Sequence, residues 1–90
     1  MRIENITWNE DTVEHISRHD VSPEEVEEVL FNDSDSPRIM RGKEHRYLAY
    51  GKTNAGRFLI VVMIITDRKT RIITARDMTD REKKFYRRKK

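Results

Sequence analysis

Apolar residues along this chain recur in short blocks, and the spacing within each block predicts a helix or a strand. The segment from Arg2 to Trp8 alternates weakly between apolar and polar residues, which predicts a short strand or extended stretch. The next apolar residues, Val13 and Ile16, are three positions apart, as on one face of a helix. Asn9 or Asp11 can cap this helix, and we expect it to run to about Arg18.

A second helix is predicted from about Pro23 to Phe31, and it has the clearest start signal in the chain. The side chain of Ser22 can accept a hydrogen bond from a free backbone N–H of the first turn, and Glu25 can reach back to complete a capping box. Pro23 occupies a position where its missing N–H does no harm. Loss of the Ser22 cap should cost about 1 kcal/mol of stability.

Three strands are predicted after a polar loop from Asn32 to Pro37. They run from about His45 to Lys52, from Arg57 to Thr66 and from Thr70 to Arg76. The links between them are so short that neighbouring strands must be antiparallel. The middle strand is apolar at both parities, which predicts that both of its faces are covered and that it is central.

A last helix is predicted from about Met78 to Arg88, where Thr79 and Glu82 can form a second capping box. The order is then a short strand, two helices, a three-stranded meander and a helix. Helices set apart from an antiparallel sheet define an α+β fold. We expect one domain over residues 1–90, with a frayed basic tail at about 87–90. The second face of the sheet must be covered by the last helix or by a partner chain.

The composition excludes several kinds of protein. The chain has no cysteine, so it has no disulfide framework, thiol nucleophile or cysteine-based zinc site, which suits a cytoplasmic protein. The longest apolar run, from Phe58 to Ile65, has eight residues. A membrane span needs about 20 residues, so no membrane helix is expected. The N-terminus lacks the basic start and apolar stretch of a signal peptide.

Charge is distributed unequally along the chain, although the net charge is only +3. Residues 1–36 have two basic and eleven acidic side chains, a net charge of −9. Residues 37–90 have seventeen basic and five acidic side chains, a net charge of +12. Such asymmetry is a hint of contact with nucleic acid or a membrane.

Basic residues surround most of the last helix, and Phe85 and Tyr86 interrupt them. Basic groups mixed with aromatic rings suit single-stranded nucleic acid, because bases stack and phosphates pair with the charges. The candidate RNA-binding residues are Arg81, Lys83, Lys84, Arg87 and Arg88. The alternative is an ordinary solvated face. The chain contains no Gly-rich phosphate loop, and no cofactor is expected.

Three residues could converge where the last strand meets the last helix. By simple alternation, Arg76 ends the strand on the face of Ile72 and Thr74. Glu82 and Tyr86 are four positions apart and share a face of the helix. An arginine held by a carboxylate beside a phenol can bind phosphate and transfer protons. The alternative is a structural ion pair with ordinary packing of the tyrosine.

Two other positions carry candidate chemistry. His15 and His19 are four positions apart on the first helix, but no third metal ligand is evident, so no metal site is expected. His19 also ends that helix, where an imidazole could serve as a base or an acid. Arg46 begins the first strand of the meander and faces the opposite side from His45.

Three segments together carry a family resemblance. Trp8 in TWNED is followed by HISRHDVSPEEVEEVLF; the middle of the chain reads RYLAYGKTNAGRFLIVVMI; the end reads ITARDMTDREKKFY. In this order and spacing they resemble BrnT-type toxins over nearly the whole chain. The last segment is the most specific, because it is similar to the Ile-Ser/Thr-Ala-Arg…Glu…Tyr signature of that family.

The resemblance implies a RelE-like fold, ribonuclease activity that arrests translation, and neutralisation by a ribbon-helix-helix antitoxin, for example within a heterotetramer. The functional candidates that it implies by position are His19, Arg46, Arg76, Glu82 and Tyr86. Two departures matter. Asp20 stands where the family usually has glycine, which puts the turn after His19 in doubt. Arg18 stands where lysine is common, which preserves the charge but not its chemistry.

RNA cleavage without a metal ion requires deprotonation of the 2′ hydroxyl, stabilisation of the phosphorane and protonation of the 5′ oxygen. Arg46 and Arg76 would stabilise the phosphorane. His19 or Glu82 would take the 2′ proton, and Tyr86 would orient the substrate or donate a proton. Two alternatives stay open: a non-catalytic inhibitor of a protein such as gyrase, and a basic nucleic-acid-binding module without toxicity.

Overall fold

The computed structural model describes residues 3, 5–31 and 37–88 of the chain. Its elements are, in order, β1 (Ile6–Thr7), α1 (Glu10–Ser17), α2 (Pro23–Leu30), β2 (Arg38–Arg41), β3 (Arg46–Lys52), β4 (Phe58–Thr66), β5 (Lys69–Asp77) and α3 (Asp80–Arg88). The start of the expected first strand, the expected loop at 32–36 and the end of the expected tail at 89–90 lie outside the described residues. Arg87 and Arg88 belong to α3.

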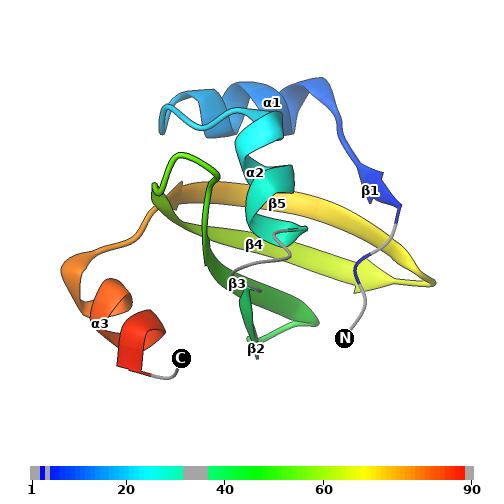
Figure 1. Ribbon diagram of the computed structural model, residues 1–90. Coiled ribbons are helices and arrows are strands. Elements are labelled where there is room, and N and C mark those ends of the chain that lie inside the picture. The colour runs from blue at the N-terminus through cyan, green and yellow to red at the C-terminus, as the bar shows by residue number, and fades with distance from the viewer. Residues whose placement is uncertain (1–2, 4, 32–36, 89–90) are drawn as a thin grey trace.

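The strands form one five-stranded sheet in the order β1-β5-β4-β3-β2 (Figure 1). Neighbours from β2 to β5 are antiparallel, whereas β1 is parallel to β5. The α+β class and the central position of β4 are confirmed. The three predicted strands form the expected antiparallel meander as β3, β4 and β5, but the prediction is incomplete, because β2 adds a fourth antiparallel strand at the edge. Its sequence, RIMR, is too short to show an alternating pattern.

Local capping signals start all three helices where the sequence predicts. The Asn9 side chain accepts a hydrogen bond of 2.8 Å from a backbone N–H in the first turn of α1. Ser22 and Glu25 form the capping box of α2, with hydrogen bonds of 3.1 and 3.2 Å. Thr79 and Glu82 do the same for α3, at 2.8 and 3.2 Å. These bonds satisfy backbone N–H groups that have no partner inside the helix.

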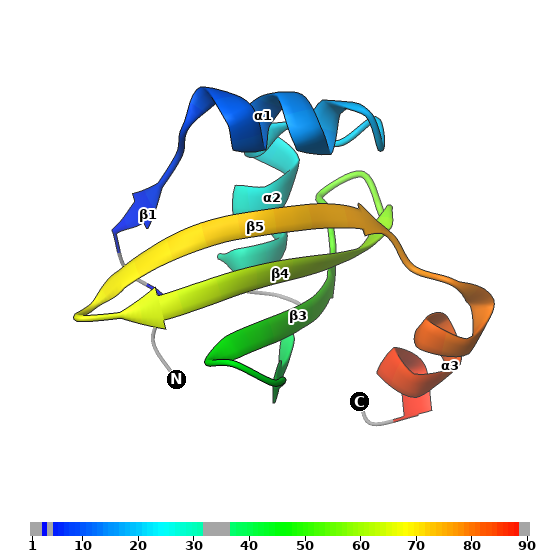
Figure 2. The same cartoon turned by 180° about the vertical axis from the view of Figure 1, so that it is seen from behind.

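Two helices cover one face of the sheet, and α3 lies on the opposite face at one end (Figures 1 and 2). The main core lies beneath α1 and α2 and contains the fully buried side chains of Ile16, Val26, Val29, Leu59, Val61 and Met63. A smaller cluster of Ile60, Met78 and Tyr86 lies between β4 and α3. Because successive strand residues point to opposite faces, β4 contributes to both clusters.

A bulge in β5 changes which of its residues share a face. Thr74 and Ile72 pair with successive residues of β4, which leaves Ile73 as the extra residue. Ile72 and Ala75 consequently both lie in the main core, while Arg76 points to the α3 face. The expectation that Arg76 shares a face with Ile72 is therefore wrong, because simple alternation does not hold across a bulge.

The α3 face is covered at one end of the sheet. Ile60 is buried there, whereas Leu48, Val62 and Ile64 are half-buried and Met40 is 36% exposed. The last helix therefore covers only part of the second face within the described residues. The remaining surface is accessible to a larger molecule that approaches along the strands.

Candidate functional site

Four residues line up across the sheet on the face that α3 covers. Arg38 pairs with Tyr50, Tyr50 pairs with Ile60, and Ile60 pairs with Arg76. Directly paired residues of neighbouring strands point to the same side, so this cross-strand row presents its two arginines and one phenol to α3. With strands about 4.8 Å apart, the row spans about 14 Å from β2 to β5.

Arg76 and Glu82 form the best-defined ion pair of the site. The two guanidinium NH groups of Arg76 donate hydrogen bonds of 2.8 and 2.9 Å to the two carboxylate oxygens of Glu82. The same carboxylate accepts the backbone N–H of Thr79, so the capping box also orients Arg76. Hydrogen bonding to Arg76 is the main reason that the pKa of Glu82 is lowered. Glu82 is therefore ionised at neutral pH and is better suited to holding Arg76 than to taking a proton.

Tyr50 is the phenol that lies beside this pair. Burial raises the pKa of Tyr50, and the charge of Glu82 raises it further, while Arg76 and Arg38 lower it. Its hydroxyl consequently keeps its proton at neutral pH and can donate a hydrogen bond. Sequence analysis did not single out Tyr50, because its importance comes from its pairing partner on β4. The sequence indicated only that Tyr50 shares a strand face with Arg46 and Leu48, because the three alternate along the strand.

Tyr86, the tyrosine expected at the site, lies in the interior. It is 1% exposed and belongs to the small cluster with Ile60 and Met78. Its ring meets the ring of Phe58 edge to face, with centroids 6.0 Å apart. This position favours a packing role for the ring.

Arg38 is a second residue that sequence analysis missed, because it lies on the missed strand β2. Its guanidinium carbon lies 4.5 Å from the centre of the Phe85 ring, in a cation–π contact. Its Nε is buried and has no hydrogen-bond partner among the described residues. The ring of Phe85 also lies 5.0 Å from that of Tyr50. Arg38, Tyr50 and Phe85 thus form one contiguous group.

The basic residues of α3 divide into two sets. Arg81, Lys84 and Arg88 line a pocket of about 450 Å³ together with Tyr50, Glu82 and Phe85, which we term the α3 pocket. The others, Lys83 and Arg87, lie over the ring of Phe58, at 5.9 and 4.9 Å from its centre. The five predicted RNA-binding residues therefore occupy two sides of the helix, and one side adjoins the Arg76–Glu82 pair.

Arg57 links several segments at the same end of the sheet. It donates hydrogen bonds of 2.8 and 3.0 Å to the carboxylate of Asp77 and longer ones of 3.2 and 3.3 Å to Glu25. It also donates to the backbone carbonyls of His19 and Asp20. The hydrogen bond from Arg57 is the main reason that the pKa of Asp77 is lowered. Arg57 therefore fixes the turn after α1 against the end of β5.

His19 lies in that turn with an exposed side chain. Its ring meets that of His15 edge to face at 5.5 Å. The described residues contain no group of three or more His, Cys, Asp or Glu side chains that could hold a metal ion. The pKa of Asp77 is lowered chiefly by Arg57 and, to the smallest extent, by a charge on His19; Asp77 follows Arg76 and points to the opposite face. Asp20 has a φ of 58°, the left-handed conformation that glycine adopts readily.

Arg46 lies on the α3 face but further along the sheet. It pairs with Ile64, four residues from Ile60 on β4, which places it about 13 Å along the strands from the cross-strand row. Its side chain is exposed. The structure thus joins Arg76 to Glu82, while Arg46, His19 and Tyr86 lie at three separate positions around them.

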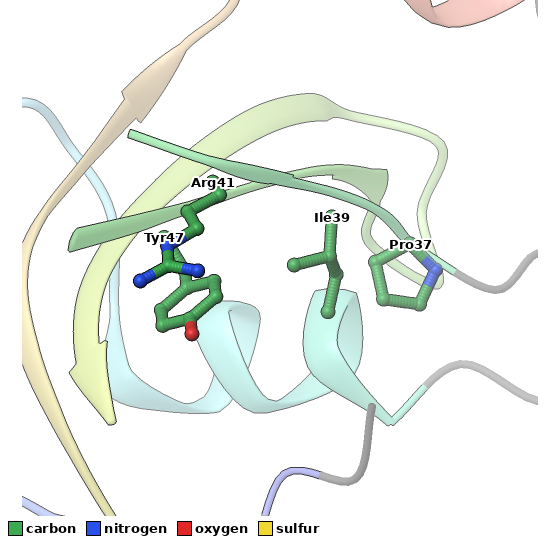
Figure 3. Close-up of a pocket in the computed structure, with 4 residues that line it drawn as sticks. All are labelled: Pro37, Ile39, Arg41 and Tyr47. Atoms are coloured by element: carbon green, nitrogen blue, oxygen red, sulfur yellow. The ribbon is translucent and has the colours of Figure 1, made fainter. Parts of the chain in front are cut away.

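A different pocket, of about 480 Å³, lies at the edge of the sheet formed by β2 and β3. It is lined by Pro37, Ile39, Arg41 and Tyr47, and the side chains of Arg41 and Tyr47 lie close together in it (Figure 3). Arg41 pairs with Tyr47, next to Met40 and Leu48 of the α3 face, so both point to the face of α1 and α2. None of the predicted site residues lines this pocket.

Comparison with known proteins identifies the class. A family model described as "Ribonuclease toxin, BrnT, of type II toxin-antitoxin system" matches residues 8–82, a range that includes Arg76 and Glu82. The chain therefore belongs to the BrnT family, as the resemblance indicated, and is a ribonuclease toxin whose partner is an antitoxin. A search of curated protein sequences found no match. Within the described part of the chain, no helix is long and apolar enough to cross a membrane.

Proposed function

We propose that this chain is a RelE-like toxin that cleaves single-stranded RNA without a metal ion, and that a ribbon-helix-helix antitoxin neutralises it. The family supplies the activity class. The observation that carries the mechanism is Arg76, which Glu82 holds through two hydrogen bonds beside the phenol of Tyr50.

The reaction is an attack of the ribose 2′ oxygen on the neighbouring phosphorus. A bond forms between the 2′ oxygen and phosphorus, and the bond from phosphorus to the 5′ oxygen breaks. One proton leaves the 2′ hydroxyl, and one reaches the 5′ oxygen. Arg76 stabilises the negative charge that develops on the phosphorane oxygens, because a fixed guanidinium placed before the reaction needs no reorganisation during it.

Glu82 acts in this proposal as the residue that positions Arg76. Its lowered pKa and its two hydrogen bonds to Arg76 argue against its role as the base. Tyr50, whose raised pKa keeps its hydroxyl protonated, transfers that proton to the leaving 5′ oxygen. His19 is the candidate base, since imidazole exchanges protons readily near neutral pH. Arg46 contacts a more distant phosphate of the same strand, and Tyr86 supports α3 from within.

The family supplies the antitoxin partner, and the distribution of charge supports a mode of neutralisation. The α3 face and α3 itself carry most of the basic side chains near the site, including Arg76, Arg81 and Lys84. An acidic segment of an antitoxin would be attracted to the same surface as RNA and would exclude it. Neutralisation would then be direct occlusion of the cleavage site.

A labelled RNA incubated with the wild-type protein and with Arg76→Ala tests the proposal. The wild type should cleave in the presence of a metal chelator, and Arg76→Ala should lose at least about 100-fold in rate, the usual effect of removing such a stabilising group. Lys69→Ala is the control, because it removes a positive charge from an exposed side chain at the opposite end of β5. Circular dichroism should be the same for all three proteins.

Two outcomes would overturn the proposal. If the wild type leaves RNA intact at micromolar concentration but still arrests growth, the chain acts on a protein target. If Arg76→Ala cleaves as fast as the Lys69→Ala control, the site lies elsewhere.

A further inference from the structure

The α3 pocket lies directly beside the Arg76–Glu82 pair and has a size suited to a small planar group. Its volume is about 450 Å³. Binding sites for small molecules usually have about 300–1,000 Å³. Two of its lining residues, Tyr50 and Glu82, also belong to the candidate cleavage site, so the pocket and the site share a wall.

Aromatic rings form the inner part of the pocket. The rings of Tyr50 and Phe85 lie 5.0 Å apart at an angle of 56°, so neither covers the face of the other completely. The guanidinium of Arg38 lies over the Phe85 ring at 4.5 Å, and both side chains are half-buried. A half-buried ring that is fixed from one side offers a rigid surface on which another planar group can stack.

Cations form the rim of the pocket. Arg81, Lys84 and Arg88 recur at helical spacing, so all three side chains lie on the same side of α3 as Phe85. No ion pair engages these three cations within the described part of the chain. The carboxylate of Glu82, which also lines the pocket, is already paired with Arg76. These cations therefore attract the phosphates that flank a group bound in the α3 pocket.

The pocket thus has aromatic rings in its interior and cations at its rim. Proteins bind a base of a single-stranded nucleic acid and its flanking phosphates with this combination. An acidic peptide would use the cations but would leave the aromatic interior empty. We propose that the α3 pocket binds one nucleobase of the RNA substrate, that of a nucleotide next to the cleaved phosphodiester. This inference rests on the proposed function and adds a subsite that helps to choose where the chain cuts.

A short RNA that is cut at one position by the wild type provides the test. Versions of it that lack a single base, at each nucleotide on either side of the cut, should reveal one position where the loss lowers kcat/KM by about 10-fold or more, as expected for a stacked base. Phe85→Leu should lower kcat/KM on the intact RNA by a similar factor. It should lose nothing further on the RNA without that base, because ring and base act as a pair.

Phe31→Leu is the matched control, since Phe31 is 50% exposed at the end of α2 on the opposite face. It should cleave every RNA as the wild type does. If base removal has no effect at any position, or if Phe85→Leu remains as sensitive to it as the wild type, the proposal is wrong. Should Phe85→Leu fail to fold, Phe85→Met, which fills similar space without an aromatic ring, takes its place in both comparisons.

Binding separates this proposal from the proposed function. Fluorescence anisotropy with RNAs that carry a 2′-O-methyl group at every position measures binding without cleavage. A base-dependent affinity that disappears in Phe85→Leu supports the pocket even if the protein cleaves nothing. Equal affinity for intact and base-free RNAs overturns it even if cleavage is confirmed.

Discussion

Arg76 and Glu82 face each other across the junction of β5 and α3 and share two hydrogen bonds, of 2.8 and 2.9 Å. The carboxylate also accepts the backbone N–H of Thr79 at the start of the helix. The same contact therefore starts α3 and orients the arginine. We expect a substitution of either residue to change the geometry of the site while the fold is retained.

Arg76→Lys should be nearly as inactive as Arg76→Ala. Lysine keeps the charge, but a single ammonium cannot reproduce the planar arrangement of two donors that matches a carboxylate. We expect a loss in kcat/KM of about 100-fold, with circular dichroism unchanged. Retention of more than a third of the wild-type rate would show that charge alone is needed.

Glu82→Gln should lower the cleavage rate without changing the shape of the pH profile on its acid side. Glu82 has a lowered pKa because of Arg76, so it stays ionised from neutral pH down to below its ordinary range near pH 4.3. Its titration thus does not contribute to the profile between about pH 5 and 8. We expect a decrease of about 10-fold at every pH in that interval, as positioning effects commonly give. Loss of an acid limb in Glu82→Gln would instead identify Glu82 as the base.

Asp77→Asn should reduce stability at neutral pH by less than about 1 kcal/mol, because the Asp77 side chain is 61% exposed and solvent screens its pair with Arg57. The pKa of Asp77 is lowered in the folded protein. Its stabilisation is therefore complete above its ordinary pKa of about 3.9 and is lost as the pH falls through the lower, folded value. Urea unfolding at several pH values should show the two proteins converging below about pH 4. A difference that grows in acid would contradict this sign.

Asp20→Gly should leave both stability and activity almost unchanged. Asp20 already has a left-handed backbone, with a φ of 58°, so the turn after His19 has the conformation that the usual glycine would adopt. Glycine relieves part of a backbone cost of about 1–2 kcal/mol but adds freedom to the unfolded chain. Asp20→Val, which cannot relieve that cost, should lower the free energy of unfolding by about 1 kcal/mol or more. A large loss of cleavage in Asp20→Gly would show that the carboxylate itself takes part.

Structural features that depend on residues close together in the sequence are predicted correctly. The capping boxes at Ser22 and Thr79, the central apolar strand and the contact between Arg76 and Glu82 all join residues a few positions apart. The sequence does not show which residues become neighbours across strands. The bulge at Ile73 reverses the expected face of Ile72 relative to Arg76, and no local pattern announces it.

The same limit applies to the positions of Tyr86 and Tyr50. Tyr86 is close to Glu82 in the sequence, but it lies inside the small cluster at 1% exposure. Tyr50 is distant in the sequence and reaches Arg76 through pairing across β4. Arg38 was not predicted for the same reason, because it belongs to a short edge strand that forms by pairing with β3. Register, a property of the folded sheet, decides which side chains meet.

The two tyrosines therefore give the sharpest comparison. Tyr50→Phe removes the hydroxyl that we propose as the proton donor, whose pKa is raised by burial and by the charge of Glu82. We expect it to lower kcat by about 10- to 100-fold while KM and stability change little, as for loss of a proton donor. Tyr86→Phe keeps the buried ring and its contact with Phe58. It should retain kcat within a factor of about three, and any effect should appear as a change of about 1 kcal/mol or less in the free energy of unfolding in urea. If Tyr86→Phe loses activity at unchanged stability and Tyr50→Phe does not, then Tyr86 is the catalytic phenol, and α3 must move to expose it.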